Sequence, residues 1–444
     1  EILIKGVFMG SQHNDHLKAV VIRKAFIKLM PILLFSYVLS YLDRVNISFA
    51  ALTMMEDLAL SAKLFGYGTG IFFIGYFLFE VPSNLLLTKF GARKWISRIM
   101  ITWGMVSVGM AFVQGEMSFL VMRFLLGAAE AGFFPGVILY LTFWFPQEFR
   151  ARIISVFMLS IPLSLAIGAP LSTALLGLNG IGGLHGWQWL FIIEGVPTII
   201  VGLIFLLVMP DRPKDAKWLN AEEKTYLQGI LDEESLKVAK KAGTKVSMAF
   251  KHPIVWILAI IYISNVTANI GLSSFLPRII KEQGTYTNMQ IGWITSIPYF
   301  VGVLGSLAFG FLTDKYKKPF IFLLVAILLT GFGLIFAGYL YAQTVIAMAI
   351  ISVSVAGIGI YGFKAPFWSL PSMFLTGAAA ATGIAMINSI GNLGGFIGPS
   401  VIGYVRDATG SYASGLYFLG GLSIFASLLS MFLMAKYSKI AQED

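Results

Sequence analysis

Long apolar blocks dominate this sequence and restrict what it can fold into. Phe65–Phe79, Phe191–Met209 and Phe320–Tyr339 contain a single charged residue between them, Glu194. Roughly 20 apolar residues in a helix are enough to cross the hydrocarbon core of a bilayer. Of the 444 residues, 57% are hydrophobic and 12% are charged, whereas soluble domains carry about 25% charged residues. The pattern predicts an all-α membrane protein.

Twelve spans fit the sequence, six on each side of one large hydrophilic insertion. In that insertion, Asn220 is followed by Ala, Glu and Glu, which is typical of a helix N-cap with an acidic first turn. An amphipathic helix on the membrane surface is expected there. The spans are expected near residues 29–51, 65–87, 96–114, 117–143, 153–177, 187–209, 254–279, 288–312, 319–341, 343–370, 379–404 and 414–436.

Weak internal repeats indicate two related halves. Thr88-Lys-Phe-Gly-Ala-Arg-Lys has a counterpart in Asp314-Lys-Tyr-Lys-Lys, and Ile167-Gly-Ala-Pro has one in Ile397-Gly-Pro. Parallel halves place a substrate site at their interface near the bilayer midplane. Residues 1–8 read unlike the rest, which suggests that the natural chain begins at Met9. The expected organisation is an N-terminal segment 1–28, a six-helix bundle 29–210, a linker 211–252, a second six-helix bundle 253–437 and a tail 438–444.

The distribution of Lys and Arg predicts the orientation. If the N-terminus lies inside, the inside segments hold 25 of these residues and the outside segments hold four. Positive charge gathers on the cytoplasmic side of membrane proteins, so a cell-membrane (inner-membrane) location with both termini and the linker in the cytoplasm is expected. The net charge of +10 is then a signal of topology and not of nucleic-acid binding.

Several classes of site are missing from the sequence. There is no cysteine, and the four histidines do not have the spacing of metal ligands. No Gly-x-x-x-x-Gly-Lys-Ser/Thr stretch for nucleotide binding and no Ser-His-Asp grouping occurs. The chain is therefore expected to be neither an enzyme nor an ATP-driven pump, and to need no metal or cofactor. Its energy would come from an ion gradient or from the gradient of the solute.

Few charges lie inside the predicted spans. A charge at the bilayer centre costs about 2.5–3.5 kcal/mol on insertion scales, so each needs a partner, a ligand or a water-filled cavity. Salt bridges that lock helices together and a substrate site are both open interpretations. The residues are the bases Arg44, Arg123 and Lys364 and the acids Asp43, Glu80, Glu130 and Glu194.

The span near 117–143 is the most informative. Arg123 and Glu130 are seven residues apart, so they share a helix face about 10 Å apart along the axis. That separation suits two groups flanking a small ligand. Gly127 between them leaves room for a substrate or for a neighbouring backbone, whereas Gly132 and Gly136 are expected to serve helix packing.

The first span carries adjacent opposite charges, Asp43 and Arg44. Adjacent helix positions point about 100° apart, so one is expected to face the site and the other a neighbouring helix. Arg44 and Arg123 would make a carboxylate clamp, because guanidinium groups bind carboxylates bidentately. By the repeat offset, Lys364 lies at a similar depth in the second half, where it either contacts a second polar group of the ligand or extends towards the cytoplasm.

The sequence resembles the major facilitator superfamily over nearly all of its spans. The run Asn84–Lys94 resembles the signature between its second and third spans, with Asn84 and Thr88 departing from the pattern, and Gly310–Lys315 keeps the pattern better. The resemblance implies twelve helices in two pseudo-symmetric six-helix bundles. It also implies that the loops with Lys89, Gly91, Arg93, Asp314 and Lys315 take part in gating.

Four further stretches resemble the anion:cation symporter family, whose bacterial members carry tartrate, phthalate, hydroxyphenylacetate, galactonate and related acids with protons. The resemblance implies that Arg44 and Arg123 hold the carboxylate, and that Asp43 and Glu130 are the protonation sites. Positions that touch substrate in relatives match Tyr41, Tyr76 and Asn388, with Trp368 a further candidate. The stretches are Tyr41–Asn46, Arg123–Glu130, Trp187–Gly195 and Asn388–Pro399.

The expected function is proton-coupled symport of a small organic carboxylate by a monomeric transporter that works by alternating access. Burial disfavours an ionised carboxylate and a nearby arginine favours it, so Glu130 beside Arg44 or Arg123 would switch between two protonation states. Alternatives are an uncoupled facilitator, an exporter or antiporter, sodium coupling, and a membrane receptor or enzyme.

Overall fold

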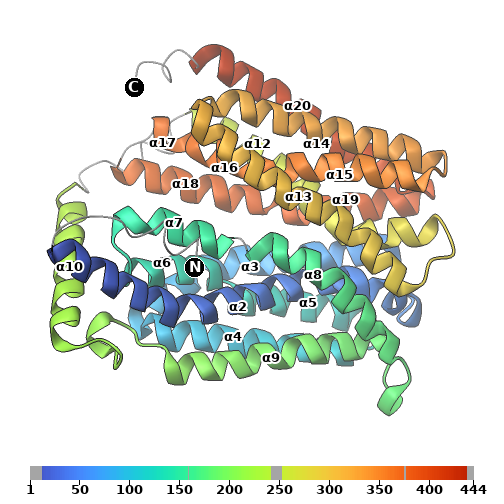
Figure 1. The fold of residues 1–444 in the computed structure, drawn as a ribbon. Coiled ribbons are helices and arrows are strands. Elements are labelled where there is room, and N and C mark those ends of the chain that lie inside the picture. Colours follow the sequence, from blue (N-terminus) through green and yellow to red (C-terminus); the bar gives the residue numbers. More distant parts are fainter. Residues whose placement is uncertain (1–12, 159, 242–252, 375–376, 438–444) are drawn as a thin grey trace.

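The computed structural model describes residues 13–158, 160–241, 253–374 and 377–437. The segment 1–8, the end of the linker and the tail 438–444 lie outside these residues. The elements of the described chain are all helices, and Figure 1 shows the long ones running side by side. The helices before the linker are α2 (His13–Asp57), α3 (Ala62–Phe90), α4 (Ala92–Gly109), α5 (Glu116–Glu130), α6 (Phe133–Thr142), α7 (Gln147–Met158), α8 (Ser160–Leu175) and α9 (Gly186–Val208).

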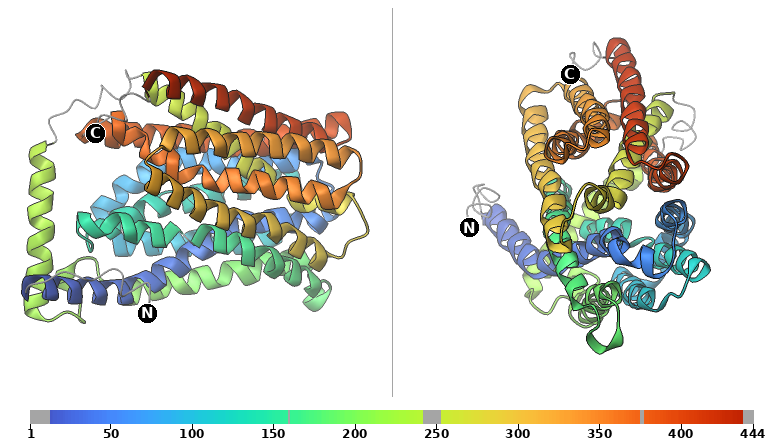
Figure 2. Two further views of the ribbon diagram at one scale, coloured as in Figure 1. Left: turned by 45° about the horizontal axis from the view of Figure 1, so that its top comes forward. Right: turned by 90° about the vertical axis from the view of Figure 1, so that its right-hand side faces the viewer.

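Within the described part of the linker lies the long helix α10, and the remaining helices follow the linker. In Figure 1, α2–α9 form one layer and α12–α20 the other, and the end-on view of Figure 2 separates the same two groups. These helices are α10 (Ala221–Lys241), α12 (Pro253–Glu282), α13 (Asn288–Tyr316), α14 (Pro319–Ala342), α15 (Ile346–Gly362), α16 (Lys364–Ser369), α17 (Pro371–Phe374), α18 (Gly377–Asn392), α19 (Gly394–Thr409) and α20 (Ala413–Tyr437).

The predicted all-α membrane architecture is confirmed. Among the described residues, eleven helices or helix pairs are long and apolar enough to cross a membrane. The twelfth predicted span, 379–404, falls on α18 and α19, two helices of 16 residues each. They follow one another across Leu393, in the glycine-rich run Gly391–Gly395. Glycine is a poor helix former, which explains an interruption that apolar content alone does not reveal.

The helix α2 is longer than its predicted span, because it begins at His13 and covers 45 residues. Its first turns lie against the linker: Lys24 Nζ is 2.6 Å from Glu223 Oε1. The helix α10 begins as the sequence predicts, with a reciprocal cap in which Asn220 Oδ1 accepts from the Glu223 N–H (2.8 Å) and Glu223 Oε2 accepts from the Asn220 N–H (3.0 Å). It crosses the ends of the spanning helices (Figure 1).

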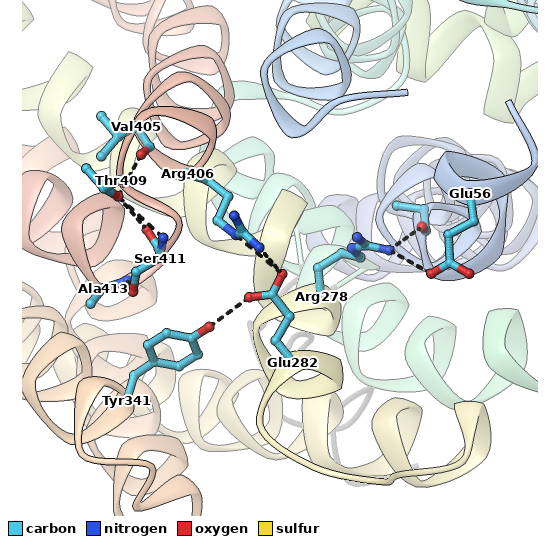
Figure 3. A network of polar contacts seen from close by, with 10 residues as sticks. Glu56, Arg278, Glu282, Tyr341, Val405, Arg406, Thr409, Ser411 and Ala413 are labelled. Atoms are coloured by element: carbon cyan, nitrogen blue, oxygen red, sulfur yellow. Dashed lines mark hydrogen bonds and ion pairs between the residues drawn. The ribbon is translucent and has the colours of Figure 1, made fainter. Parts of the chain in front are cut away.

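The two halves are joined by polar contacts at the end of the bundle away from α10, which we call the closed end. Glu56 at the end of α2 lies 3.6 Å from Arg278 of α12 (Figure 3). It also lies 2.8 Å from Lys281 of the same helix. The ammonium of Lys281 also donates to the Leu52 carbonyl (2.6 Å). Nearby, the N–H of Lys63 donates to Asp407 (2.8 Å).

Backbone contact between α3 and α19 reinforces the closed end. A Cβ on Gly66 would lie 2.3 Å from the Pro399 carbonyl oxygen, and one on Gly403 would lie 2.2 Å from that of Ala62. Small residues allow helices to approach this closely within a membrane. The halves are therefore held together at the closed end by both ion pairs and backbone contact.

The same device sets the distance between α3 and α5, the helices that carry Tyr76 and Arg123. A Cβ on Gly127 would lie 1.9 Å from the Phe72 carbonyl oxygen, and one on Gly75 would lie 2.4 Å from that of Phe124. Of the two roles the sequence left open for Gly127, the structure shows the approach of a neighbouring backbone.

We expect Gly127→Ala to force α3 and α5 apart. Overpacking of this kind costs about 1–3 kcal/mol, so the detergent-solubilised variant should melt several degrees below the wild type and transport more slowly. The matched control is Gly421→Ala in α20, because a Cβ there meets no atom within 4 Å. Equal melting temperatures for the two variants would contradict this packing.

We expect Glu56→Gln to loosen the closed end, since Lys281 and Arg278 then lose their carboxylate. The chain has no native cysteine, so a single Ser273→Cys reporter in the interface can be labelled with an impermeant maleimide added at the closed end. An exposed ion pair contributes at most about 1 kcal/mol, which corresponds to a two- to fivefold faster labelling. The control is Glu116→Gln, which changes an exposed acid at the same end and should leave the labelling rate unchanged. Equal labelling rates for the two variants would show that the Glu56 ion pairs do not hold the closed end together.

Candidate functional site

A small cavity lies between the halves, and it contains both arginines that the sequence singled out. Arg44 comes from α2 and Arg123 from α5. Three aromatic rings, of Tyr41, Phe72 and Phe73, form part of its wall. The other lining residues are Val45, Ile47, Ser48, Thr69 and Leu165 from the first half and Asn269, Ile270, Ser273 and Ser274 from α12.

Arg44 is bound to Glu130. Its Nε and Nη2 both lie 2.8 Å from Glu130 Oε1, and Ser40 Oγ donates to the same oxygen at 2.6 Å. Glu130 is 1% exposed and its second oxygen, Oε2, is buried without a hydrogen-bond partner. The carboxylate that the sequence placed near one of two arginines is thus paired across helices with Arg44, and not with Arg123 on its own helix.

Glu130 is also the last residue of α5. The helix is interrupted at Ala131 and Gly132 before α6 begins at Phe133, and Gly132 adopts a left-handed conformation with φ of 86°. Glycine takes this conformation without a steric penalty. The break leaves the carboxylate of Glu130 at a helix end, where its position does not depend on a continuous helix.

Aromatic rings surround the Arg44 guanidinium. Its Cζ lies 5.3 Å from the centroid of Tyr41, 5.2 Å from that of Tyr76 and 5.8 Å from that of Phe72. Rings at this distance attract a cation and exclude water from it. Tyr41 and Tyr76 therefore position Arg44, and Tyr41 also lines the cavity.

Arg123 has a different environment. Its Nε donates to the Gly68 carbonyl (3.2 Å) and its Nη2 to that of Thr69 (3.5 Å), while Nη1 is buried without a partner. In the described part of the chain, no carboxylate lies within ion-pair distance of Arg123. A side chain that is 1% exposed, charged and open on one nitrogen is suited to receive an anion, because an unpaired buried charge is costly.

Asp43 points away from the cavity. Its Oδ2 accepts from Trp103 Nε1 (2.6 Å) and its Oδ1 accepts from Ser107 Oγ (2.7 Å), both on α4. Of the adjacent charges in α2, Arg44 faces the cavity and Asp43 faces the neighbouring helix. The carboxylate is 1% exposed.

The second half supplies uncharged groups that the sequence analysis did not single out. Asn269, Ser273 and Ser274 lie on the α12 face that lines the cavity, and Asn269 Oδ1 accepts from Tyr361 OH (3.2 Å). With Asn265, the positions 265, 269 and 273 are four apart. This spacing places the three side chains on one face of a helix, and it could have indicated from the sequence that this face is polar.

Three further candidates of the second half are not among the lining residues. Lys364 Nζ lies 6.0 Å from the centroid of the Tyr361 ring. Tyr361 in turn donates a hydrogen bond to Asn269 of the cavity lining. Trp368 packs its ring against Tyr262, with centroids 5.0 Å apart. Asn388 is partly buried on α18.

The candidate gating residues lie at helix ends. Gly91 separates α3 from α4, and the N–H of Arg93 donates to Asp211 Oδ1 (2.8 Å) just after α9. Lys89 and Lys315 lie beside aromatic rings near the ends of α3 and α13, and Asp314 is exposed. Within the described ranges, no cluster of three His, Cys, Asp or Glu side chains is placed to hold a metal ion.

Solved structures of membrane transporters have a similar fold. A bacterial homologue of the human lysosomal transporter Spinster, in an inward-facing, occupied conformation, matches with a TM-score of 0.70 and 18% identity over 98% of each chain. A D-xylose–proton symporter matches with a TM-score of 0.70 and 16% identity over 91% of this chain and 97% of that one. At these identities the likeness concerns the fold.

Sequence relatives cover almost the whole chain. A protein of Agrobacterium vitis, provisionally named a tartrate transporter, is 47% identical over 95% of this chain and 96% of its own. A quinolone resistance transporter of Acinetobacter baumannii is 42% identical over 94% and 96%. The inner membrane transport protein RhmT of Escherichia coli strain K12 is 37% identical over 96% and 97%.

The family model of the Major Facilitator Superfamily matches residues 33–399 and 285–442. This range includes the cavity, the Arg44–Glu130 pair and both groups of helices. The expectations of a transporter fold and of a protein that is not an enzyme are confirmed by this match and by the relatives. The chain belongs to the Major Facilitator Superfamily.

Proposed function

We propose that this chain imports a small organic carboxylate together with protons by alternating access. The observation that carries the proposal is the contrast between the two arginines of the cavity. Arg44 is paired with Glu130. Arg123, seven residues before Glu130 on α5, has a buried nitrogen, Nη1, without a hydrogen-bond partner. An entering carboxylate can bind Arg123 at once, but it gains Arg44 only if Glu130 releases it.

A proton on Glu130 provides that release. Protonation removes the negative charge that attracts Arg44, so the guanidinium becomes available to the carboxylate, which it binds strongly as a charge-assisted pair. Loss of the proton on the other side of the membrane restores Glu130 as a competitor for Arg44 and helps to expel the anion. Proton and anion are then bound together and released together, as symport requires.

The cavity lining supports a hydroxylated acid as substrate. Hydroxyl and amide groups of Ser48, Thr69, Asn269 and Ser273 are placed around the arginines, where they can bond the hydroxyl groups of tartrate or of a sugar acid. Relatives of Agrobacterium vitis with provisional names as tartrate transporters support the same class. The rings of Phe72 and Phe73 leave an aromatic acid as the second option.

Orientation and conformation follow from the expected topology. If both termini and α10 are cytoplasmic, the closed end faces outward, and the structure corresponds to a transporter shut towards the outside. The division into bundles 29–210 and 253–437, the inner-membrane location and the monomeric state are part of this proposal. No cofactor other than the coupling proton is proposed.

Export is the second candidate, because the relative of Acinetobacter baumannii is named a resistance transporter. Proteoliposomes that contain either buffer, for uptake, or labelled tartrate, for efflux, and that are given an outside-acid gradient separate the two. Import predicts accumulation of labelled tartrate that a protonophore abolishes, and replacement of sodium by choline should have no effect. Accumulation that needs sodium, or extrusion driven by the same gradient, would contradict proton-coupled import.

We expect Glu130→Gln to uncouple transport. Glutamine keeps the size of the side chain and its carbonyl but cannot gain or lose a proton. Labelled tartrate should still exchange across the membrane in counterflow at a rate within several-fold of the wild type, while accumulation driven by a pH gradient should fall to background. Normal pH-driven accumulation would remove Glu130 from the coupling step.

We expect Arg123→Ala to abolish most tartrate binding. Hydrogen bonds to charged groups contribute about 1.5–3 kcal/mol, which corresponds to a ten- to hundredfold weaker affinity. The measurement is the tartrate-dependent rise in melting temperature, since a ligand stabilises the state that binds it. Arg98→Ala on α4, whose guanidinium stacks on Trp95, is the control. An unchanged rise in Arg123→Ala would place the substrate elsewhere.

A further inference from the structure

A second cluster of polar side chains lies behind the cavity wall, between α2, α4, α8 and α9. Its two acids are Asp43 and Glu194, which are 1% and 4% exposed and are not among the residues that line the cavity. Glu194 lies on α9, and its Oε1 accepts from Ser172 Oγ on α8 at 2.7 Å. The coupling mechanism above makes no use of Glu194.

The two acids are connected through neighbours that they share. Asn46 Nδ2 donates to Asp43 Oδ1 (3.2 Å), and the same amide interacts with Glu194. Thr198, one turn after Glu194, is 3.5 Å from Asp43 Oδ2 and 3.4 Å from the Glu194 carbonyl oxygen. Asp43 and Glu194 therefore belong to one buried network.

The hydrogen bonds of the two acids differ. Asp43 receives Trp103 and Ser107 at short distances, and also Asn46 and Thr198. Such a set of donors stabilises an ionised carboxylate. Glu194 accepts one short hydrogen bond, from Ser172, in addition to its contact with the Asn46 amide, and its Oε2 is buried without a hydrogen-bond partner.

A proton accounts for the environment of Glu194. An ionised carboxylate accepts hydrogen bonds only, so a buried oxygen without a donor loses its solvation and gains nothing in return. A protonated carboxyl is also a donor. Asn46 Oδ1 in the same network is itself buried without a donor, so it offers an acceptor to such a proton.

The surrounding charges favour the same assignment. Asp43 is a charged neighbour of Glu194. Glu130 and Arg123, both on α5, are charged neighbours of Asp43. Glu130 is already neutralised by Arg44. Two buried carboxylates that share neutral donors do not both ionise readily, because each negative charge disfavours the other. Arg123 supplies one positive charge in the neighbourhood of Asp43, beyond ion-pair distance, which suits one ionised carboxylate and not two.

We propose that Asp43 and Glu194 form a proton-binding pair, separate from the substrate cavity, in which Glu194 carries the proton while Asp43 is ionised. The pair is a second place for the coupling ion beside Glu130, and this part of the inference rests on the proposed function. Asp43 is adjacent to Arg44 on α2, so a second proton that neutralised Asp43 would weaken its bonds to α4 next to the arginine that binds the anion.

The test is infrared spectroscopy of the full-length protein in lipid at neutral pH, which needs no substrate. The carbonyl-stretch band of a buried, protonated carboxyl should be present in the wild type, absent in Glu194→Gln and retained in Glu116→Gln, because Glu116 is exposed. Ser172→Ala should shift the band without removing it, because Ser172 bonds to Glu194. This variant provides the assignment even if Glu194→Gln fails to fold.

Two results would overturn the proposal. One is a spectrum that neither Glu194→Gln nor Ser172→Ala changes. The other is a rise in melting temperature in sodium chloride relative to choline chloride that Glu194→Gln removes, because the oxygens would then bind a sodium ion and not a proton. A normal tartrate response alongside either result would leave the proposed transport function intact, and a missing tartrate response would leave the proton pair intact.

Discussion

The ion pair between Arg44 and Glu130 organises the centre of this transporter. It joins α2 to α5 inside the first half, where a charge without a partner would be costly. Because Ser40 and Arg44 both use Oε1, the other carboxylate oxygen stays without a partner. The pair therefore holds Arg44 through one carboxylate oxygen of Glu130 and leaves the other oxygen unused. A carboxylate substrate would be chemically the same kind of partner as Glu130, and in the proposed mechanism their competition for Arg44 would link anion binding to a proton.

Other contacts between helices hold Arg44 and Arg123 at the same cavity and join the two halves beside it. Close contact through Gly127 fixes α5 against α3, so that Arg123 lies within reach of the same cavity as Arg44. At the closed end, Glu56 with Lys281 and the glycines of α3 and α19 join the two halves. Exposed ion pairs of this kind are individually weak. A closure built from several weak contacts can open without a large barrier, as the proposed alternating access would require.

The sequence predicts the membrane class, the N-cap of α10 and the set of buried charges, because apolar length and intramembrane charge are local properties. Which partner a charge takes is not local. That Arg44 and not Asp43 faces the cavity depends on the rotation of α2 about its axis, and that Glu130 meets Arg44 depends on how α2 lies against α5. The α12 contribution, Asn269 and Ser273, was missed because a search for charge overlooks uncharged polar residues four apart. The interruption between α18 and α19 was missed because apolar content does not register helix breaks.

The most direct test of the central claim is the number of protons taken up when tartrate binds. Purified protein in weakly buffered solution near neutral pH is mixed with tartrate, and a pH indicator records the change. Competition between Glu130 and the anion for Arg44 predicts that binding draws protons from solution in the wild type, and that Glu130→Gln binds tartrate with correspondingly less uptake. Tartrate binding by the wild type with no proton uptake would contradict the claim.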